Sequence, residues 1–91
     1  MNTIWKYPLA KQTETVDVCV VRPVHVGPDP SGRACIWMEV DPEVAPTSCT
    51  TRVVCTGEPI PEHYGQHAGS FIEGSFVWHV YVAICAVEVT L

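Results

Sequence analysis

Histidines are the residues of this sequence best suited to acid–base or metal chemistry. His63 and His67 are four residues apart with Glu62 beside them, and on a helix this spacing would place two imidazoles on one face, as a zinc site requires. Gly65 lies between them in a turn-rich segment, and no third ligand follows at a suitable spacing. The pattern favours ordinary loop histidines, so we predict no metal site and no cofactor.

His79 lies in an apolar run between Trp78 and Val80, on the face of a predicted strand that Val77 and Tyr81 share. A histidine there is a candidate general base, or a ring that stacks a planar ligand together with Tyr81. No serine or cysteine has a spacing to His79 that defines a nucleophile. The commoner role is a half-buried residue hydrogen-bonded across the sheet, so we assign no catalytic residue.

The cysteines are the other nucleophiles. Cys55 precedes the Thr56–Gly57 turn, where backbone N–H groups or a cation can activate a thiol, but Arg52 is the only cation nearby. The chain holds five cysteines, an odd number, without a C-x-x-C pair. We therefore expect free thiols that pack as small hydrophobes rather than a disulfide framework.

Two further features suggest binding rather than catalysis. Thr56–Pro61 is a rigid, glycine-led loop that could form one wall of a ligand pocket, but it lacks the Gly-Lys-Ser/Thr element of a phosphate loop. Trp37 falls on the face of its strand opposite Ile36 and Met38, where it meets a second sheet, a partner or solvent. The candidate residues for ligand or partner binding are Trp37, Gly57, Glu58, His63, Tyr64, His67, His79 and Tyr81.

The elements that position these residues are strands, because apolar residues recur with a period of two and β-branched and aromatic types dominate each run. Pro23 argues for an edge position or a bulge, and Glu73-Gly74 is typical of a tight hairpin turn. A short helical turn near Pro61–Tyr64 is an open alternative. The expected strands are Thr3–Tyr7, about Thr15–Arg22, Ala34–Val40, Cys49–Thr56, Gly69–Ile72 and Ser75–Val87.

These strands predict an all-β fold in one domain, residues 1–91, built as a small antiparallel sandwich or partly open barrel of about six strands. Sandwich and barrel stay open at this point. A chain of 91 residues buries only roughly 60–65 % of the surface that its unfolded form exposes. Because that margin is small, a homo-oligomer is a second expectation.

Charge and hydropathy exclude two classes of partner. Ten acidic residues oppose five scattered basic ones, for a formal charge of −5, so no basic face exists for nucleic acid. The longest apolar run, Val80–Val87, is far shorter than the roughly 20 residues of a membrane helix. The first residues lack a secretion signal, so we expect a cytoplasmic protein.

Three motifs stand out along the chain: the Ile4–Leu9 opening (I-W-K-Y-P-L), the Thr56–Pro61 turn (T-G-E-P-I-P) and the Phe76–Tyr81 strand (F-V-W-H-V-Y). Together they resemble a family of small uncharacterised proteins encoded by bacteriophages and prophages. Cys55 stands where the family usually has glycine. The resemblance implies a viral accessory protein in the cytoplasm of an infected bacterial cell and carries no activity with it.

The leading hypothesis is a binding module without catalytic activity that occupies a host protein or a small ligand, for example to counter host defence. A small hydrolase or nucleotide-processing enzyme that uses His79 is the first alternative. A minor virion or assembly component is the second.

Overall fold

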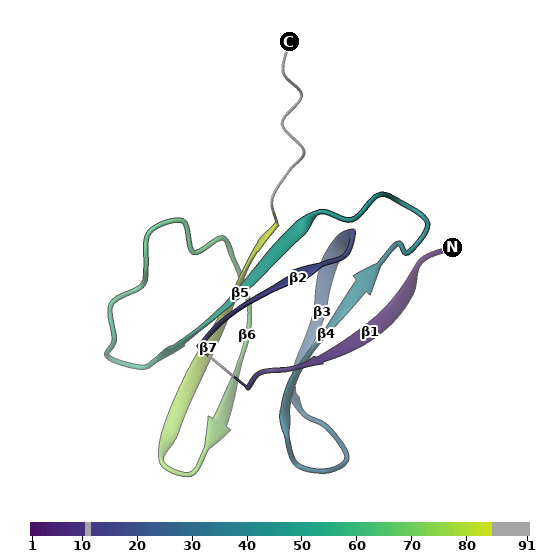
Figure 1. The fold of residues 1–91 in the computed structure, drawn as a ribbon. Helices are drawn as coiled ribbons and strands as arrows, with labels where there is room; N and C mark the ends of the chain where they lie inside the picture. The colour runs from purple at the N-terminus through teal and green to yellow at the C-terminus, as the bar shows by residue number, and fades with distance from the viewer. Residues whose placement is uncertain (11, 85–91) are drawn as a thin grey trace.

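A computed structural model describes residues 1–10 and 12–84, which form seven strands (Figure 1). Within these residues no helix is long and apolar enough to cross a membrane. The strands are β1 (Thr3–Pro8), β2 (Thr13–Asp17), β3 (Val20–Pro28), β4 (Ala34–Val40), β5 (Ser48–Cys55), β6 (Gln66–Glu73) and β7 (Phe76–Ile84).

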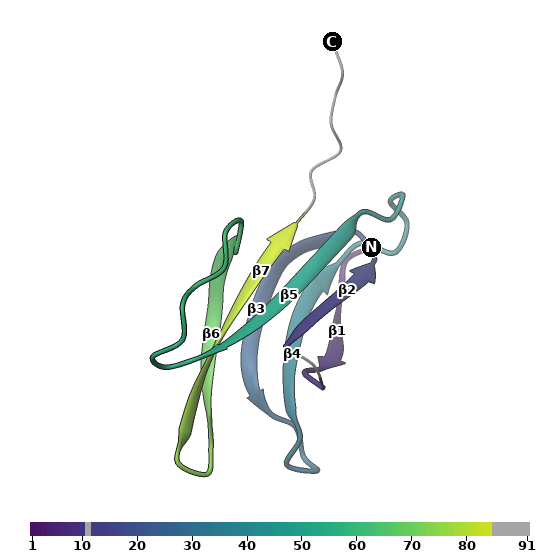
Figure 2. The same cartoon turned by 60° about the vertical axis from the view of Figure 1, so that its left-hand side comes forward.

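The strands form two antiparallel sheets that pack face to face (Figures 1 and 2). One sheet has the order β1-β4-β3 and the other the order β2-β5-β7-β6. β3 lies against β6, so the two sheets approach each other along this side. The β3–β4 and β6–β7 hairpins end at the same end of the molecule. The predicted all-β antiparallel fold is confirmed, as a sandwich of two sheets and not a closed barrel.

The core lies between the sheets and follows the predicted alternation. Ile36, Met38 and Val40 of β4 are fully buried, and they cluster with Val80 and Val82 of β7. Burying a Val, Ile or Met side chain contributes about 1.5–3 kcal/mol, so these residues are the main stabilising group. The alternation therefore fixes which side chains of β4 and β7 face outward, and these are the candidates for function.

The predicted strand at Thr15–Arg22 is wrong in its bounds. The chain leaves one sheet at Val18–Cys19, so β2 and β3 belong to different sheets. Pro23 does not end β3, because β3 is an edge strand and a proline there can leave its missing N–H on the open side. Register shifts flank Pro23 on both sides, which confirms the predicted edge or bulge.

The irregular segment between the predicted strands Cys49–Thr56 and Gly69–Ile72 is shorter than expected. Irregular backbone covers residues 56–65, and β6 begins at Gln66 instead of Gly69. Residues 62–63 form a turn and no helix. Gly74, with φ +59°, and Ser75 form the hairpin turn one residue later than predicted. β7 runs to Ile84, and the predicted extension to Val87 lies outside the described residues.

Candidate functional site

The outer face of the four-stranded sheet gathers most of the polar rings of the described chain. Since Val80 and Val82 face the core, the alternation of β7 turns His79 and Tyr81 outward. β7 lies between β5 and β6, so the 56–65 loop that joins those two strands has to cross it (Figure 1). Gly65 passes so close to β7 that a Cβ there would clash with the Val82 carbonyl oxygen.

His79 is the centre of a chain of hydrogen bonds. Its Nε2 lies 2.8 Å from Thr56 Oγ1, and its Nδ1 lies 2.8 Å from Ser70 Oγ. Ser70 Oγ is in turn 3.3 Å from His67 Nε2. At the other end the Thr56 hydroxyl donates to the Val77 carbonyl oxygen at 3.2 Å.

The Val77 carbonyl sets the direction of this chain, because a carbonyl oxygen can only accept. The Thr56 hydroxyl donates its single hydrogen to the Val77 carbonyl oxygen. Its oxygen therefore accepts a hydrogen bond from Nε2–H of His79. Nδ1 of that neutral imidazole then accepts from the Ser70 hydroxyl, which accepts from His67. One set of proton positions satisfies all these groups, so the ring of His79 is held in a single orientation and tautomer.

An aromatic cluster lies beside this chain. The Tyr81 ring makes edge contacts with Tyr64, at a centroid distance of 4.9 Å, and with His67, at 5.3 Å. The His67 and His79 rings are 6.3 Å apart. Edge-to-face pairs of this kind contribute about 0.5–1.5 kcal/mol beyond their buried area. The contact of Tyr64 with Tyr81 therefore holds the loop against the sheet, although Tyr64 as a residue is 42 % exposed.

A bulge in β6 is what brings His67 and Ser70 to the same face. Residues three apart on a regular strand point to opposite faces. The register of β6 against β7 shifts between His67 and Gly69, so one extra residue, Ala68, is inserted there. His67 then pairs with Tyr81 and Ser70 with His79, and both side chains reach the outer face.

The loop is anchored to β5 at both ends. Arg52 Nη1 donates to the carbonyl oxygens of Glu62, at 2.8 Å, and His63, at 3.3 Å. At the start of the loop, the Glu58 carboxylate accepts from the Cys55 backbone N–H at 2.8 Å, and the Glu58 N–H donates to the Cys55 carbonyl at 2.9 Å. Gly57 has φ +97° within this turn, a value that favours glycine.

A hollow of about 260 Å³ lies between the loop and the two outward rings of β7. It is lined by apolar, polar and acidic residues and by two residues with rings. The lining residues are Val54, Cys55, Thr56, Gly57, Glu58, Ile60, His79 and Tyr81. Ser70 and His67 do not line it, because they lie on the β6 side of His79.

Most of the candidate residues from the sequence meet on this face. Gly57, Glu58, His79 and Tyr81 line the hollow, and Tyr64 and His67 contact Tyr81. His63 contributes its carbonyl to Arg52 from a backbone with φ 56°. That these residues bind a ligand stays a prediction.

Trp37 is the exception. It is half-buried on the outer face of the three-stranded sheet, where its ring lies 5.4 Å from that of His25. That face belongs to the other sheet, so Trp37 takes no part in the His79 cluster.

Sequence reasoning missed Thr56, Ser70 and Arg52 as members of the site. Thr56 lay inside the loop that was singled out, but its contact with His79 depends on how the turn folds back. Ser70 faces His79 only because of the register and the bulge, and neither leaves a signal in one sequence. Arg52 could have been considered as an anchor, since it is the one basic residue between Arg33 and the end of the chain.

The cysteines of the described part of the chain are free thiols, as predicted; Cys85 lies outside it. Burial raises the pKa of Cys49 to about 11, and burial is also the main reason why the pKa of Cys35 is raised. Both thiols stay protonated near neutral pH and are poor nucleophiles. Across residues 1–10 and 12–84 no three His, Cys, Asp or Glu side chains are grouped to hold a metal ion.

The hydrogen bonds of His79 differ from those of the histidine in a catalytic triad. Both nitrogens of His79 are held by neutral hydroxyls, whereas a catalytic imidazole of the serine-hydrolase type has a carboxylate on its second nitrogen. Ser70, whose hydroxyl donates to His79, does not line the hollow. A molecule in the hollow would meet rings and hydrogen-bonding groups.

Comparison with known proteins assigns the chain to a family. The family model described as a domain of unknown function (DUF7352) matches residues 1–89. No curated protein and no solved structure is significantly similar to the chain.

Proposed function

Because the chain belongs to the DUF7352 family, to which no function is attached, we propose from its own geometry that it is a binding module without catalytic activity. Its ligand is a small molecule, or a side chain of a host protein, that presents a flat ring to Tyr81 and a hydrogen-bonding edge to His79 and Thr56. We include in the proposal the expectation from the sequence motifs that the protein is viral and acts in the cytoplasm of an infected bacterium.

One observation carries the proposal: the hollow touches His79, Tyr81 and Thr56 but not Ser70. The ring surface of Tyr81 supplies contact area at low entropic cost, and its edge contacts with Tyr64 and His67 hold it in place before any ligand arrives. Ligand sites of this kind combine apolar walls with a few fixed polar groups. At about 260 Å³ the hollow accepts a fragment-sized group rather than a large ligand.

The experiment compares two histidine variants on opposite sheets. His79→Leu removes the central ring of the site, whereas His25→Leu removes an exposed ring beside Trp37 on the other sheet and serves as the matched control. Purified protein is incubated with the small-molecule fraction of a bacterial extract and analysed by native mass spectrometry and ligand-observed NMR.

We expect a ligand that is retained by the wild-type protein and by His25→Leu and is bound at least tenfold more weakly by His79→Leu. A companion pull-down with the protein fraction of the extract tests the alternative that the ring belongs to a host protein. If neither fraction yields a ligand, or if His79→Leu retains it fully, the proposal is wrong.

A second candidate function is a small hydrolase, and one contact favours it. Ser70 Oγ donates to His79 Nδ1 at 2.8 Å, which is the arrangement of a nucleophile and its base. Assays with activated carboxylic and phosphoric esters decide between the two functions. Turnover that disappears in Ser70→Ala and persists in His25→Leu would establish the hydrolase and would contradict the binding module.

A further inference from the structure

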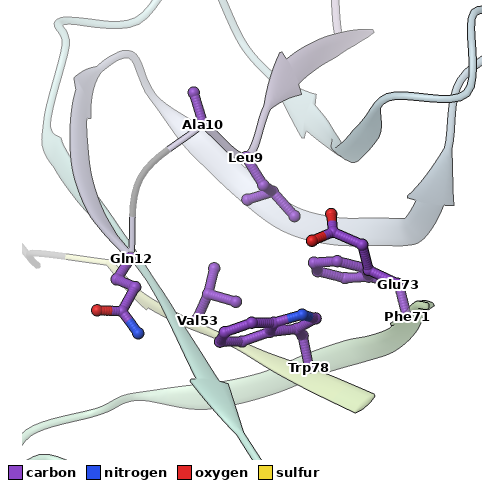
Figure 3. A pocket seen from close by; sticks show the side chains of 7 residues that line it. All are labelled: Leu9, Ala10, Gln12, Val53, Phe71, Glu73 and Trp78. Atoms are coloured by element: carbon purple, nitrogen blue, oxygen red, sulfur yellow. The ribbon is translucent and has the colours of Figure 1, made fainter. Parts of the chain in front are cut away.

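A second hollow, of about 210 Å³, lies between the sheets, beside the end of β1 and the start of β2. Figure 3 shows Leu9 reaching into it opposite Trp78 and Val53, with the Glu73 carboxylate at one end and Gln12 at the other. Trp78 and His79 point to opposite faces of β7, so this hollow is separate from the proposed binding site. Its lining residues are Leu9, Ala10, Gln12, Val53, Phe71, Glu73 and Trp78.

Glu73 is the unusual member of this lining. Along β6, Phe71 and Glu73 share the face that turns toward the other sheet, while Ile72 points outward and is 76 % exposed. An acidic side chain therefore occupies the last inward position of the strand and lines the hollow. Among the ion pairs of residues 1–10 and 12–84 none includes Glu73.

Two aromatic residues line the same hollow as this carboxylate. Trp78 and Phe71 are cross-strand partners on the same inward face, and both line the hollow. The face of an aromatic ring attracts a cation within about 6 Å of its centre, most strongly in tryptophan. Ring faces with a carboxylate at the rim are the arrangement by which proteins hold alkylated ammonium groups.

We propose that this hollow binds an organic monocation of the alkylammonium class. An anion would be repelled by Glu73, and a bare metal ion would find one carboxylate and one amide, too few ligands for a stable site. The volume limits the size of the cation: at about 30 Å³ for each water-sized group, the hollow holds an ammonium head with its methyl groups and little more.

The probe is tetramethylammonium chloride, titrated into ¹⁵N-labelled protein at constant chloride concentration while the indole N–H signal of Trp78 is followed. The neutral analogue tert-butanol, similar in shape and without charge, is titrated in parallel. We expect a saturable shift with the cation and at least fivefold weaker binding of the alcohol.

Variants test the assignment to Glu73. Glu73→Gln keeps the shape of an exposed side chain and removes its charge, and we expect it to weaken binding of tetramethylammonium at least fivefold. Glu62→Gln, an exposed carboxylate on the opposite loop, is the matched control and should bind as the wild type does. His79→Leu should also bind normally, so that failure of this proposal and failure of the proposed function are distinguishable.

Lys11 lies between two lining residues in the sequence, so the titration is repeated with Lys11→Gln. Absence of saturable binding in both the wild type and Lys11→Gln overturns the proposal, as does an unchanged affinity in Glu73→Gln. Choline and a peptide with trimethyllysine are then titrated to distinguish a free ligand from a protein partner. Tighter binding of choline indicates a free small molecule, and tighter binding of the peptide indicates a protein partner.

Discussion

Gly69 is the residue by which the packing of the two sheets can be tested most directly. It follows the bulge in β6 and faces β3, where an added Cβ would lie 2.9 Å from Val26 Cβ and 3.1 Å from Val26 Cγ2. Carbon atoms in good contact are about 3.5–4.0 Å apart. Gly69→Ala therefore forces β6 away from β3 by several tenths of an ångström.

The magnitude follows from this overlap. Overpacking of a well-packed core costs about 1–3 kcal/mol, and for a domain of this size each kcal/mol lowers Tm by about 4–8 °C. Elsewhere in a strand, alanine is favoured over glycine by about 0.5–1 kcal/mol. The expected result, a net loss of stability, thus has the opposite sign from what strand propensity alone predicts.

Gly27→Ala is the matched control. Gly27 is also a strand glycine, but a Cβ there meets only the His25 side chain, at 2.9 Å from Nε2, and that ring can turn away. We expect Gly27→Ala to change the free energy of unfolding by less than about 1 kcal/mol, since a flexible exposed side chain relieves the overlap. Both variants are measured by thermal unfolding followed by circular dichroism.

Gly69→Ala should also change the hydrogen bonds of the candidate site. Ser70 follows Gly69 and holds Nδ1 of His79, so moving β6 lengthens this hydrogen bond and shifts the imidazole signals of His79 in NMR spectra. A Gly69→Ala protein as stable as the wild type would refute the reasoning, and so would a Gly27→Ala protein that loses as much. The first result would mean that β3 and β6 are not in the close contact described, and the second that the His25 ring does not turn away.

Three more predictions concern single side chains. Ser70→Ala leaves Nδ1 of His79 without its donor and should lower the free energy of unfolding by about 0.5–1.5 kcal/mol in urea titrations; no change would mean that water replaces the hydroxyl. Hydrogen bonds from Ser31, and next from Lys6, hold the pKa of Asp29 well below its usual value. A lowered pKa stabilises the folded state above the unfolded value and loses this effect as pH falls, so Asp29→Asn should flatten the loss of stability below about pH 4. Burial raises the pKa of Cys49 to about 11, so a thiol reagent at pH 8 should modify Cys49 only after unfolding; rapid modification of the native protein would contradict its burial.

The strands could largely be predicted because their signal is local. The alternation of Ile36, Met38 and Val40 is visible in the sequence and is the pattern found in the buried face of β4. The break between β2 and β3 could not be predicted, because Val18 and Cys19 are apolar like the start of β3 and the chain changes sheet there without a glycine or proline. Which sheet a strand joins depends on contacts between segments far apart in the sequence.

The aromatic and imidazole rings of the candidate site could be predicted from the sequence, but the hydrogen bonds between its side chains could not. His79 and Tyr81 were singled out because a period of two places them together on the face away from the core. Ser70 was not, because the bulge at Ala68 changes which residues of β6 face outward, and a bulge depends on the pairing of two strands rather than on one. Thr56 likewise meets His79 only through the backbone of the turn.

The register of the β6–β7 hairpin determines which side chains line each of the two proposed sites. The turn at Gly74 and Ser75 sets Trp78 on the inward face, where it lines the hollow beside Glu73, and His79 on the outward face beside Ser70. A shift of one residue would exchange these faces, burying a histidine and exposing a tryptophan. Gly74, with φ +59°, adopts the backbone that the tight turn needs, and a side chain there would be strained. The turn therefore has to be kept in any variant that separates the two sites, which is why the variants His79→Leu and Glu73→Gln alter side chains and leave the turn untouched.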